Sequence, residues 1–483
     1  HGLDGQGIWL AFPFEFAERM FPMVGLLDVL DQCQTIFKGA VHALSVEGHH
    51  RMGGIADQGE EMSLAPLGQF MANIPFVGAA AIPPTATAIR RLMHYGQILQ
   101  SHALHFFHLA SPDLLFGFDS DPAKRNVVGV LAAHPELARH GILLRKFGQE
   151  IIRVTAGKRV HGTGSIPGGV NKRITVAERD ELAAPLPDVL AWAQAGVRLV
   201  ADLFAANRAL YEGFGTVRSS LLSLVAADGT LDLYDGGLRA RDADGALLFD
   251  GVRCEDYGAR IHENVRSWSY MKFPFFAALG PEAGWYKVGP LARIQNCDAI
   301  GTPLAEAARQ ELVAQALGGV QHAPLAYHWA RMIELLHAAE VIAGLLADPA
   351  LLGDELAARG ARAGTGIGII EAPRGTLIHH YEVDADDLVT MCNLIVSTTH
   401  NNHAMNASVR AVAQEYFDGH SITEGLLNRM EVAVRAYDPC LSCATHALGS
   451  MPLQVQLVDT AGQVRDSVLR HGDGRIEHTN ART

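Results

Sequence analysis

The sequence predicts a mainly α (α+β) fold, in which a large helical-bundle core carries small antiparallel β insertions. Apolar residues recur at three- and four-residue steps along several stretches, which is typical of amphipathic helices that share a core. Strand signals are fewer, shorter and separated by Asp-Gly turns. Apolar residues make up 48% of the 483 residues and charged residues 19%, so a large core can be buried. Since no internal repeat or long linker divides the chain, we expect one large domain.

Four segments carry the helical pattern. The first, ATAIRRLMHYGQILQSHALHFFHLASPDLLFG, is predicted to be helical from about Ile89 to Leu109, and Ser111-Pro112 is predicted to end that helix. In the last of the four, Thr423 and Glu424 suit a helix start. The other three segments are DVLAWAQAGVRLVADLFAANRALYEGF from Asp188, AYHWARMIELLHAAEVIAGLL from Ala326 and SITEGLLNRMEVAVRAY from Ser421.

Two segments are predicted to form strands. Residues 220–251 contain short apolar runs between Asp-Gly turns, which favours a small antiparallel sheet, and GIGIIEAPRGTLIHHYEV suggests a second pair of strands. The closing segment, LQVQLVDTAGQVRDSVLRHGDGRIEHTNART, turns polar and shows no obvious core face. We therefore expect this tail to be detachable from the core.

Charge and composition exclude several classes of partner. With 39 Lys and Arg against 52 Asp and Glu, the net charge is −13, so neither nucleic acid nor an anionic membrane surface is expected to attract the chain. The most apolar N-terminal stretch, from Ile8, contains four charged residues and two prolines, so no membrane helix or Sec signal peptide is predicted. Six cysteines favour a reducing compartment, and we expect a cytoplasmic protein.

The segment DPCLSCATH contains two thiols and an imidazole spaced three apart, at Cys440, Cys443 and His446. A C-x-x-C pair can bind one soft metal ion, but a zinc site normally needs a second pair, and the other four cysteines are single. Spacing alone leaves open a metal half-site and a pair of inert buried cysteines.

The wider sequence resembles one enzyme family. DPCLSCATH is similar to the C-terminal motif of [NiFe] hydrogenase large subunits, and WSYMKFPFF, GWYKVGPLARIQNCD, LAYHWARMIELLHAAE, EAPRGTLIHHY and LVTMCNLIVSTTHNN resemble its cytoplasmic, NAD-linked branch. The resemblance extends from about Pro83 to His446. It implies a large-subunit core at 83–446, an atypical region at 1–82, and a C-terminal extension at 447–483 that the family removes on maturation.

The resemblance also implies metal ligands and a proton relay. Cys440 matches a terminal nickel thiolate and Cys443 a thiolate that bridges nickel and iron, and the family's iron also carries cyanide and carbon monoxide. His446 matches the last residue of the mature family protein, which binds magnesium, and the backbone carbonyl near Leu394 matches a second magnesium contact. Glu47, in VEGH, matches a glutamate that relays protons from the site.

Further positions match residues around the family's metal centre. Arg374 matches an arginine whose guanidinium lies over the open metal position, and Asp113 and Asp438 match the carboxylates that hold it. Ser397 and Thr398 match residues that donate hydrogen bonds to an iron cyanide.

Simpler interpretations compete with these roles. Arg374 could belong to a buried ion pair, and Asp113 could cap a turn. The histidines at i, i+3 and i+6 of one helix are interpreted as packed side chains rather than metal ligands: His102, His105 and His108. HGTGSIPGG fits neither dinucleotide fingerprint nor P-loop, so we interpret its glycines as sites of close backbone packing and place NAD on another subunit.

One family motif is missing. The family supplies two further thiolates from an N-terminal R-x-C-G-x-C motif, which this sequence lacks, and Cys33 alone cannot replace them. Two functions therefore stay open. The first is the catalytic subunit of a soluble NAD-linked hydrogenase with a nickel–iron centre and magnesium. The second is a non-catalytic scaffold related to the quinone-site subunit of respiratory complex I.

The catalytic interpretation implies several partners. The chain has too few cysteines for its own iron–sulfur clusters, so we expect electrons to pass first to an iron–sulfur small subunit, then to diaphorase subunits that carry flavin (FMN) and NAD. A maturation endopeptidase and nickel-delivery proteins are also implied by the resemblance. Neither nucleic acid nor membrane is expected.

Overall fold

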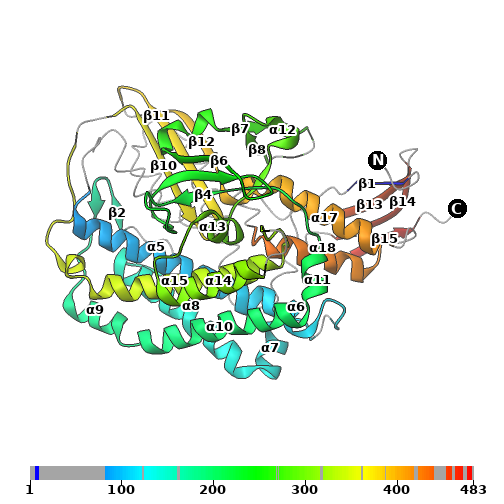
Figure 1. Cartoon of the computed structure of the whole chain (residues 1–483), viewed down its shortest axis with the longest axis horizontal. Helices are drawn as coiled ribbons and strands as arrows, with labels where there is room; N and C mark the ends of the chain where they lie inside the picture. The colour runs from blue at the N-terminus through cyan, green and yellow to red at the C-terminus, as the bar shows by residue number, and fades with distance from the viewer. Residues whose placement is uncertain are drawn as a thin grey trace.

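The computed structural model describes most of the chain after residue 81. The described residues are 6–9, 82–121, 124–159, 164–267, 269, 271–315, 319–360, 363–386, 388–417, 422–439, 453–459, 463–470 and 476–480. Figure 1 shows long helices in one part of the molecule, small sheets packed above them, and a separate sheet beside the ends of α17 and α18. The prediction of a mainly helical fold with small antiparallel sheets is confirmed.

Long helices build the core. Helix α15 lies centrally and packs against α5, α10, α13 and α14. Its N-terminal half is buried on all sides because apolar residues surround the helix there, and its exposed positions fall towards the C-terminal half. The long helices are α5 (Pro84–Leu104), α8 (Pro135–Ala156), α10 (Leu186–Ala206), α14 (Pro303–Ala314), α15 (Ala326–Ala347), α17 (Asn402–Tyr416) and α18 (Glu424–Ala436).

Short helices connect the long ones. They are the π-helix η1 (His105–Ala110), α6 (Ser111–Phe116), α7 (Val127–Ala133), α9 (Val176–Ala183), α11 (Arg208–Gly213), the 3₁₀ helix η2 (Cys254–Ala259), α12 (Gly280–Ala283), α13 (Pro290–Asn296), the 3₁₀ helix η3 (Pro349–Leu352) and α16 (Ser397–His400).

All four predicted helical segments are helical, but some boundaries differ. The first helix begins at Pro84 rather than near Ile89, and the segment from Asp188 is divided between α10 and α11. The chain does not leave the helical path at Ser111-Pro112, because α5 continues through η1 into α6. A proline in the first turn of a helix loses no intrahelical hydrogen bond, so here Pro112 begins a helix instead of ending one. At α18 the prediction is confirmed, since the Thr423 hydroxyl accepts a hydrogen bond from the Leu426 amide at 3.2 Å.

Both predicted sheets are present. The first has the order β6-β5-β4-β9, with β4 (Ser220–Val225), β5 (Gly237–Arg241) and β6 (Leu247–Val252) antiparallel and β9 (Tyr286–Lys287) parallel to β4. The second is an antiparallel sheet of β10 (Thr365–Ala372), β11 (Gly375–Val383) and β12 (Val389–Ile395). The two sheets share an apolar cluster that includes Leu222, Leu238, Ile369 and Ile378. Two smaller hairpins are β2 (Ser165–Ile166) with β3 (Gly169–Val170), and β7 (Ile261–Asn264) with β8 (Phe273–Phe276).

The glycine-rich segment packs as expected. A Cβ atom at Gly169 would collide with the backbone of Leu356, and Arg90 donates to the Gly169 carbonyl at 2.7 and 3.1 Å. Close backbone packing of this segment is therefore confirmed for its described part.

The polar tail differs from the prediction, because it has a core face. Strands β13 (Leu453–Asp459), β14 (Val464–Arg470) and β15 (Ile476–Asn480) form an antiparallel sheet, which β1 (Gln6–Trp9) extends. Val455 and Leu457 are each 5% exposed and belong to the main core cluster. The alternation of apolar and polar residues in LQVQL is the period-two signal of a half-buried strand, which the polar composition of the whole tail concealed.

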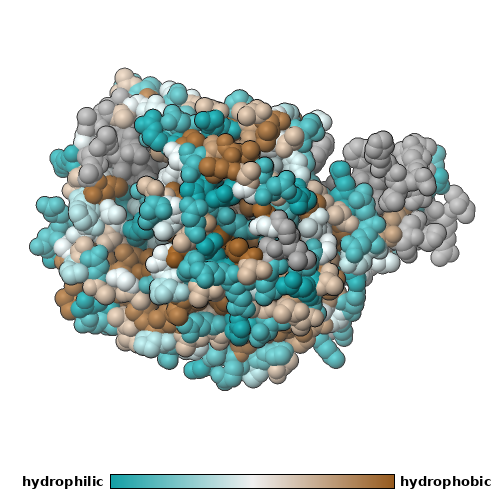
Figure 2. Space-filling model, in the orientation of Figure 1, coloured by the Kyte–Doolittle hydropathy of each residue, from teal (hydrophilic) through white to brown (hydrophobic). Residues whose placement is uncertain are grey.

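One stretch meets the length and hydropathy expected of a membrane-crossing helix. It spans Val176–Ala206, and 39% of its most apolar window is buried inside the molecule. In the structure this stretch is divided between α9 and α10, and α10 packs against α15. On the face seen in Figure 2, hydrophobic residues form small separate groups among hydrophilic ones. One stretch of this length and hydropathy is only weak evidence of a membrane-spanning helix.

Candidate metal-site surroundings

The turn between β10 and β11 positions Arg374. Ala372 pairs with Gly375, so Pro373 and Arg374 form a two-residue turn at the tip of the hairpin. Gly375 has φ +141°, and a Cβ atom there would collide with the Val288 side chain, so this position requires glycine. The Arg374 side chain is 28% exposed, and its Nη2 lies 3.4 Å from Oδ1 of Asp438. The hairpin thus positions the Arg374 guanidinium group near the C-terminal end of α18.

Asp438 lies just beyond α18, two residues before Cys440. It is the only described non-glycine residue with positive φ, at 54°, a conformation that aspartate tolerates better than most residues. Its side chain is buried, and burial raises the pKa of the carboxyl group, while the charges of Arg374 and Arg331 oppose that rise. The structure therefore brings together Arg374 and Asp438, which the resemblance had paired.

Side chains from other helices cap the C-terminal end of α18. His105 Nε2 lies 2.8 Å from the Arg435 carbonyl oxygen, and Arg331 Nη2 donates to the Ala436 carbonyl at 3.0 Å. The last carbonyls of a helix lack the usual amide partners, and these side chains supply partners to two of them. The Arg435 carbonyl also accepts the Asp438 amide at 3.0 Å. The His105 ring stacks on that of His328, and burial holds the pKa of both imidazoles well below the ordinary value, so both are neutral at pH 7.

Asp113 reaches the same helix end by different contacts. It lies in the first turn of α6, is 4% exposed, and forms an ion pair with Arg435 of α18 and another with Nε of Arg125 at 3.2 Å. Through Arg435 it supports the helix that leads to Asp438. The resemblance had assigned Asp113 to holding Arg374, and that role remains a proposal.

Ser397 contacts the turn directly, because its hydroxyl, at the start of α16, donates to the Gly375 carbonyl at 2.8 Å. The next residue, Thr398, is 2% exposed. Leu394 pairs with His379 across β11 and β12, four residues along β11 from Gly375, and its side chain packs against the cluster that includes Leu377 and Val396. The ligands proposed for these three residues remain proposals.

A buried charged network supports the turn, and the sequence interpretation missed it. Glu334 of α15 accepts hydrogen bonds from Arg293 at 2.7 and 2.6 Å and lies 3.0 Å from His102. Burial alone would raise the pKa of Glu334, but the charge of Arg293 and the bond with His102 lower it to about 2. Arg293 also donates to Glu371 at 2.9 Å. A charged residue within the apolar run MIELLHAAE was the available signal.

Arginines and carboxylates lie together around the end of α18. Arg435 pairs with Asp113 and lies 3.4 Å from Glu431, and Arg374 lies 3.4 Å from Asp438. The charge of Arg331 acts on both Asp438 and Glu334. A cation that contacts Asp438 favours anions near the end of α18.

Four predicted site residues lie outside the described residues, namely Glu47, Cys440, Cys443 and His446. Within the described part of the chain, no three His, Cys, Asp or Glu side chains form a metal-binding group. Burial raises the pKa of Cys254 and Cys297 to about 12, so both remain protonated thiols. The surroundings therefore fit an anionic metal centre next to Cys440, and the sequence supplies one of the two thiolate pairs that the family uses.

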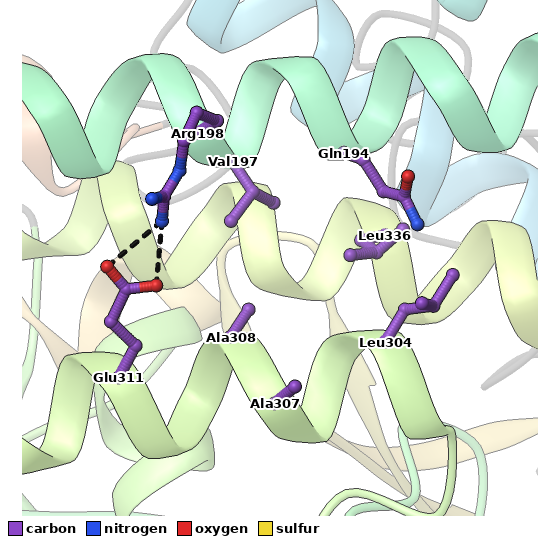
Figure 3. A pocket seen from close by; sticks show the side chains of 8 residues that line it. All are labelled: Gln194, Val197, Arg198, Leu304, Ala307, Ala308, Glu311 and Leu336. Carbon is purple, nitrogen blue, oxygen red and sulfur yellow. Dashed lines mark hydrogen bonds and ion pairs between the residues drawn. The ribbon is translucent and has the colours of Figure 1, made fainter.

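A surface pocket lies elsewhere in the fold. It has a volume of about 220 Å³ and lies between α10, α14 and α15. At one end of the pocket, Arg198 of α10 forms an ion pair with Glu311 of α14 (Figure 3). None of the candidate site residues is among its lining residues, which are Gln194, Val197, Arg198, Leu304, Ala307, Ala308, Glu311 and Leu336.

Comparison with known proteins identifies the family. Residues 238–446 match the family model described as nickel-dependent hydrogenase. The chain is 45% identical over 412 residues to the NAD-reducing hydrogenase HoxS subunit beta of Cupriavidus necator, covering 83% of this chain and 84% of the relative. It is 40% identical to a vhu subunit of the F420-non-reducing hydrogenase of Methanocaldococcus jannaschii, covering 72% of this chain and 83% of that relative.

Solved structures agree. A crystal structure of an NAD⁺-reducing [NiFe]-hydrogenase in the H2-reduced state matches with a TM-score of 0.77 and 53% identity, covering 81% of this chain and 85% of that one. A [NiFeSe] hydrogenase from Desulfovibrio vulgaris Hildenborough matches with a TM-score of 0.61 and 19% identity, covering 86% and 89%, which shows the shared fold. The chain thus belongs to the nickel-dependent hydrogenases, oxidoreductases that act on dihydrogen, as a homologue of the large subunit of the NAD-reducing enzymes.

Proposed function

We propose that this chain is the catalytic subunit of a soluble NAD-linked hydrogenase, which oxidises H2 and passes the electrons through an iron–sulfur small subunit to NAD(P). The observation that carries the proposal is the ion pair of Arg374 with Asp438, at 3.4 Å, directly before the Cys440 motif. The 45% identity to part of an NAD-reducing hydrogenase supports the same function.

The proposed ligands come from the C-terminal motif and from β12. Cys440 and Cys443 would hold a nickel–iron centre whose iron carries cyanide and carbon monoxide, and His446 with the Leu394 carbonyl would hold magnesium. When bound, the nickel–iron centre supplies the redox chemistry that separates H2 into two protons and two electrons. Thr398 would donate a hydrogen bond towards a cyanide ligand. Ser397 would do the same once its hydroxyl turns away from the Gly375 carbonyl, to which it donates in this structure.

The protein's own side chains supply electrostatics and a proton path. Arg374 presents a fixed cation at the entrance to the site, and Asp438 fixes its orientation. The positive charge of Arg374, next to Asp438, would favour the ionised form of the Cys440 and Cys443 thiols. We assign the exit of the proton to Cys440 and then Glu47.

Partners, maturation and location follow from the same family. We infer a cytoplasmic complex with diaphorase subunits that carry FMN and NAD and with an iron–sulfur small subunit. We also infer that nickel-delivery proteins load the site and that an endopeptidase then removes residues 447–483. We keep the division into 1–82, 83–446 and 447–483. The family match covers residues 238–446, and its end at His446 supports the second of these boundaries.

Metal analysis of the purified complex tests the proposal. We expect nickel in an amount equal to this chain, iron in excess of nickel because the small subunit carries iron–sulfur clusters, and infrared bands of metal-bound cyanide and carbon monoxide. The alternative is a scaffold subunit, which is favoured only by the missing N-terminal cysteine pair. Nickel-free protein that still binds the iron–sulfur subunit would establish the scaffold and refute the enzyme.

A further inference from the structure

Arg293 is a buried arginine whose donors are all used. It lies on α13, is 0% exposed, and contacts both α15 and the β10–β11 hairpin. Nε and Nη2 donate to the two oxygens of Glu334 at 2.7 and 2.6 Å, and Nη1 donates to Glu371 at 2.9 Å. The two remaining donors bind the backbone carbonyls of Ala372 at 2.6 Å and Pro373 at 3.1 Å. A guanidinium group has five N–H donors, so none is left over.

The two backbone bonds act on the turn that carries Arg374. The Pro373 carbonyl belongs to the planar peptide group that joins Pro373 to Arg374. A hydrogen bond to its oxygen therefore fixes the orientation of that peptide group and, with it, the position of the Arg374 backbone nitrogen. The start of α13 approaches the same turn, because a Cβ atom at Gly289 would lie 2.8 Å from the Arg374 carbonyl oxygen. One short helix therefore holds the turn at two points.

We propose that Arg293 is a positioning residue that fixes the Pro373–Arg374 turn and thereby sets the Arg374 guanidinium against Asp438. The two carboxylates anchor Arg293 from opposite sides. Glu334 is itself fixed by His102 of α5, and Glu371 accepts the Leu224 amide and the Thr376 hydroxyl, each at 2.8 Å. Rigid helices and strands thus define the position of a cation at the site. The catalytic consequence rests on the proposed hydrogenase function, whereas the effect on the turn does not.

The Arg293→Lys substitution distinguishes a role that depends on the geometry of the guanidinium group from one that depends only on its positive charge. Lysine keeps the positive charge between the two carboxylates, but its ammonium group is a point donor and cannot reach two carboxylates and two carbonyls together. Arg239→Lys is the matched control, since Arg239 is also buried, pairs with both oxygens of Asp250 at 2.8 Å, and donates to the Asn296 carbonyl at 3.0 Å. None of the bonds given for Arg239 goes to residues 372–375, and the bond to Asn296 reaches the C-terminal end of α13.

The first measurement is amide hydrogen exchange of the full chain in its complex. In Arg293→Lys we expect exchange of the peptide covering the turn to accelerate about 10-fold or more, because the fixed peptide plane is released. In Arg239→Lys the same peptide is expected to exchange as in the unsubstituted protein. Equal exchange of the turn in all three proteins would overturn the proposal. If Arg293→Lys does not fold, Glu371→Gln, which keeps shape but removes one anchoring charge, is expected to change exchange in the same direction.

The second measurement is hydrogen uptake. We expect kcat to fall about 10- to 100-fold in Arg293→Lys with KM for H2 unchanged, because a small displacement of a catalytic group costs turnover more than binding. Faster exchange of the turn with unchanged kcat would overturn the positioning role. If the unsubstituted protein shows no uptake, the hydrogenase function fails, and the exchange experiment still decides whether Arg293 holds the turn.

Discussion

The two ends of α18 are held in different ways. At the C-terminal end, polar side chains from η1, α6, α15 and the β10–β11 hairpin contact Arg435, Ala436 or Asp438. At the N-terminal end, the tail sheet contributes apolar residues of β13 and one buried carboxylate. Asp466, 0% exposed, accepts the Ile422 amide at 2.8 Å and lies 2.8 Å from His478 of β15.

This difference bears on the proposed removal of residues 447–483. Several helices and the β10–β11 hairpin contact the C-terminal end of α18, whereas a buried carboxylate of the tail sheet contacts the residue Ile422 before its N-terminal end. Such an arrangement suits the proposal that the tail is present while the site is loaded and is then removed. In the sequence, residues 440–452 lie between the two regions and include both cysteines of the motif.

The largest effect is expected at the site end from Cys443→Ser. Serine lacks the soft thiolate that would hold the metals, so we expect hydrogen uptake to be abolished and nickel content to fall. Uptake assays and metal analysis of the purified complex check this result. Cys392→Ser, at an exposed position of β12, is the control and should retain uptake. Normal hydrogen uptake by Cys443→Ser would contradict the assignment of the metal site to the segment that follows α18.

The next largest effect concerns the network beneath the site. Glu334→Gln leaves Arg293 with one carboxylate in a buried position, and we expect a loss of about 3–5 kcal/mol in the free energy of unfolding, measured by urea denaturation. The folded pKa of Glu334, about 2, lies below the ordinary 4.5, so its stabilisation is complete above pH 4.5 and is lost as the pH falls towards 2. In Glu334→Gln, the free energy of unfolding should therefore fall less between pH 4.5 and pH 2 than in the unsubstituted protein. An unchanged unfolding midpoint would show that the network does not support the core.

A smaller effect is expected from a buried histidine of the same interior. Burial lowers the pKa of His94 from 6.5 to about 3. Between these two pH values His94 binds a proton in the unfolded chain but not in the folded protein. Stability should consequently fall as the pH drops below 6.5, and at pH 5 this one residue accounts for about 2 kcal/mol at most. His94→Phe should lose less stability between pH 7.5 and pH 5 than the unsubstituted protein. The urea midpoint at the two pH values measures this, and an identical change in both proteins would contradict it.

The smallest effect is expected at the tail end. Asp466→Ala removes the acceptor of the Ile422 amide, which costs about 1–3 kcal/mol locally. We expect faster amide exchange in the tail strands and at the start of α18, with little change at the turn of Arg374. Asp119→Ala, which removes an exposed partner of Arg429 on the same helix, is the control. If Asp466→Ala loosened both ends of α18 equally, the two ends would not be independent.

Much of the site could be predicted because its signals are local. Arg374, Asp438, Ser397 and Thr398 were located through short motifs, and the structure brings Arg374 to Asp438 and Ser397 to the turn beside Arg374. The ion pairs of Asp113 with Arg125 and Arg435 were not predicted. Those partners lie 12 and 322 positions away, and the sequence pattern does not specify which arginine a buried aspartate meets.

The sequence by itself determined the helical fold, the two small sheets, the family and the cysteine motif, since periodicity, turn residues and motifs are properties of neighbouring positions. Only the tertiary structure decided that Arg293 joins Glu334 to Glu371, that His105 and Arg331 cap α18, and that a polar tail buries Val455 and Leu457. These contacts join residues far apart in the chain, and the burial that makes each of them strong exists only once the helices have packed.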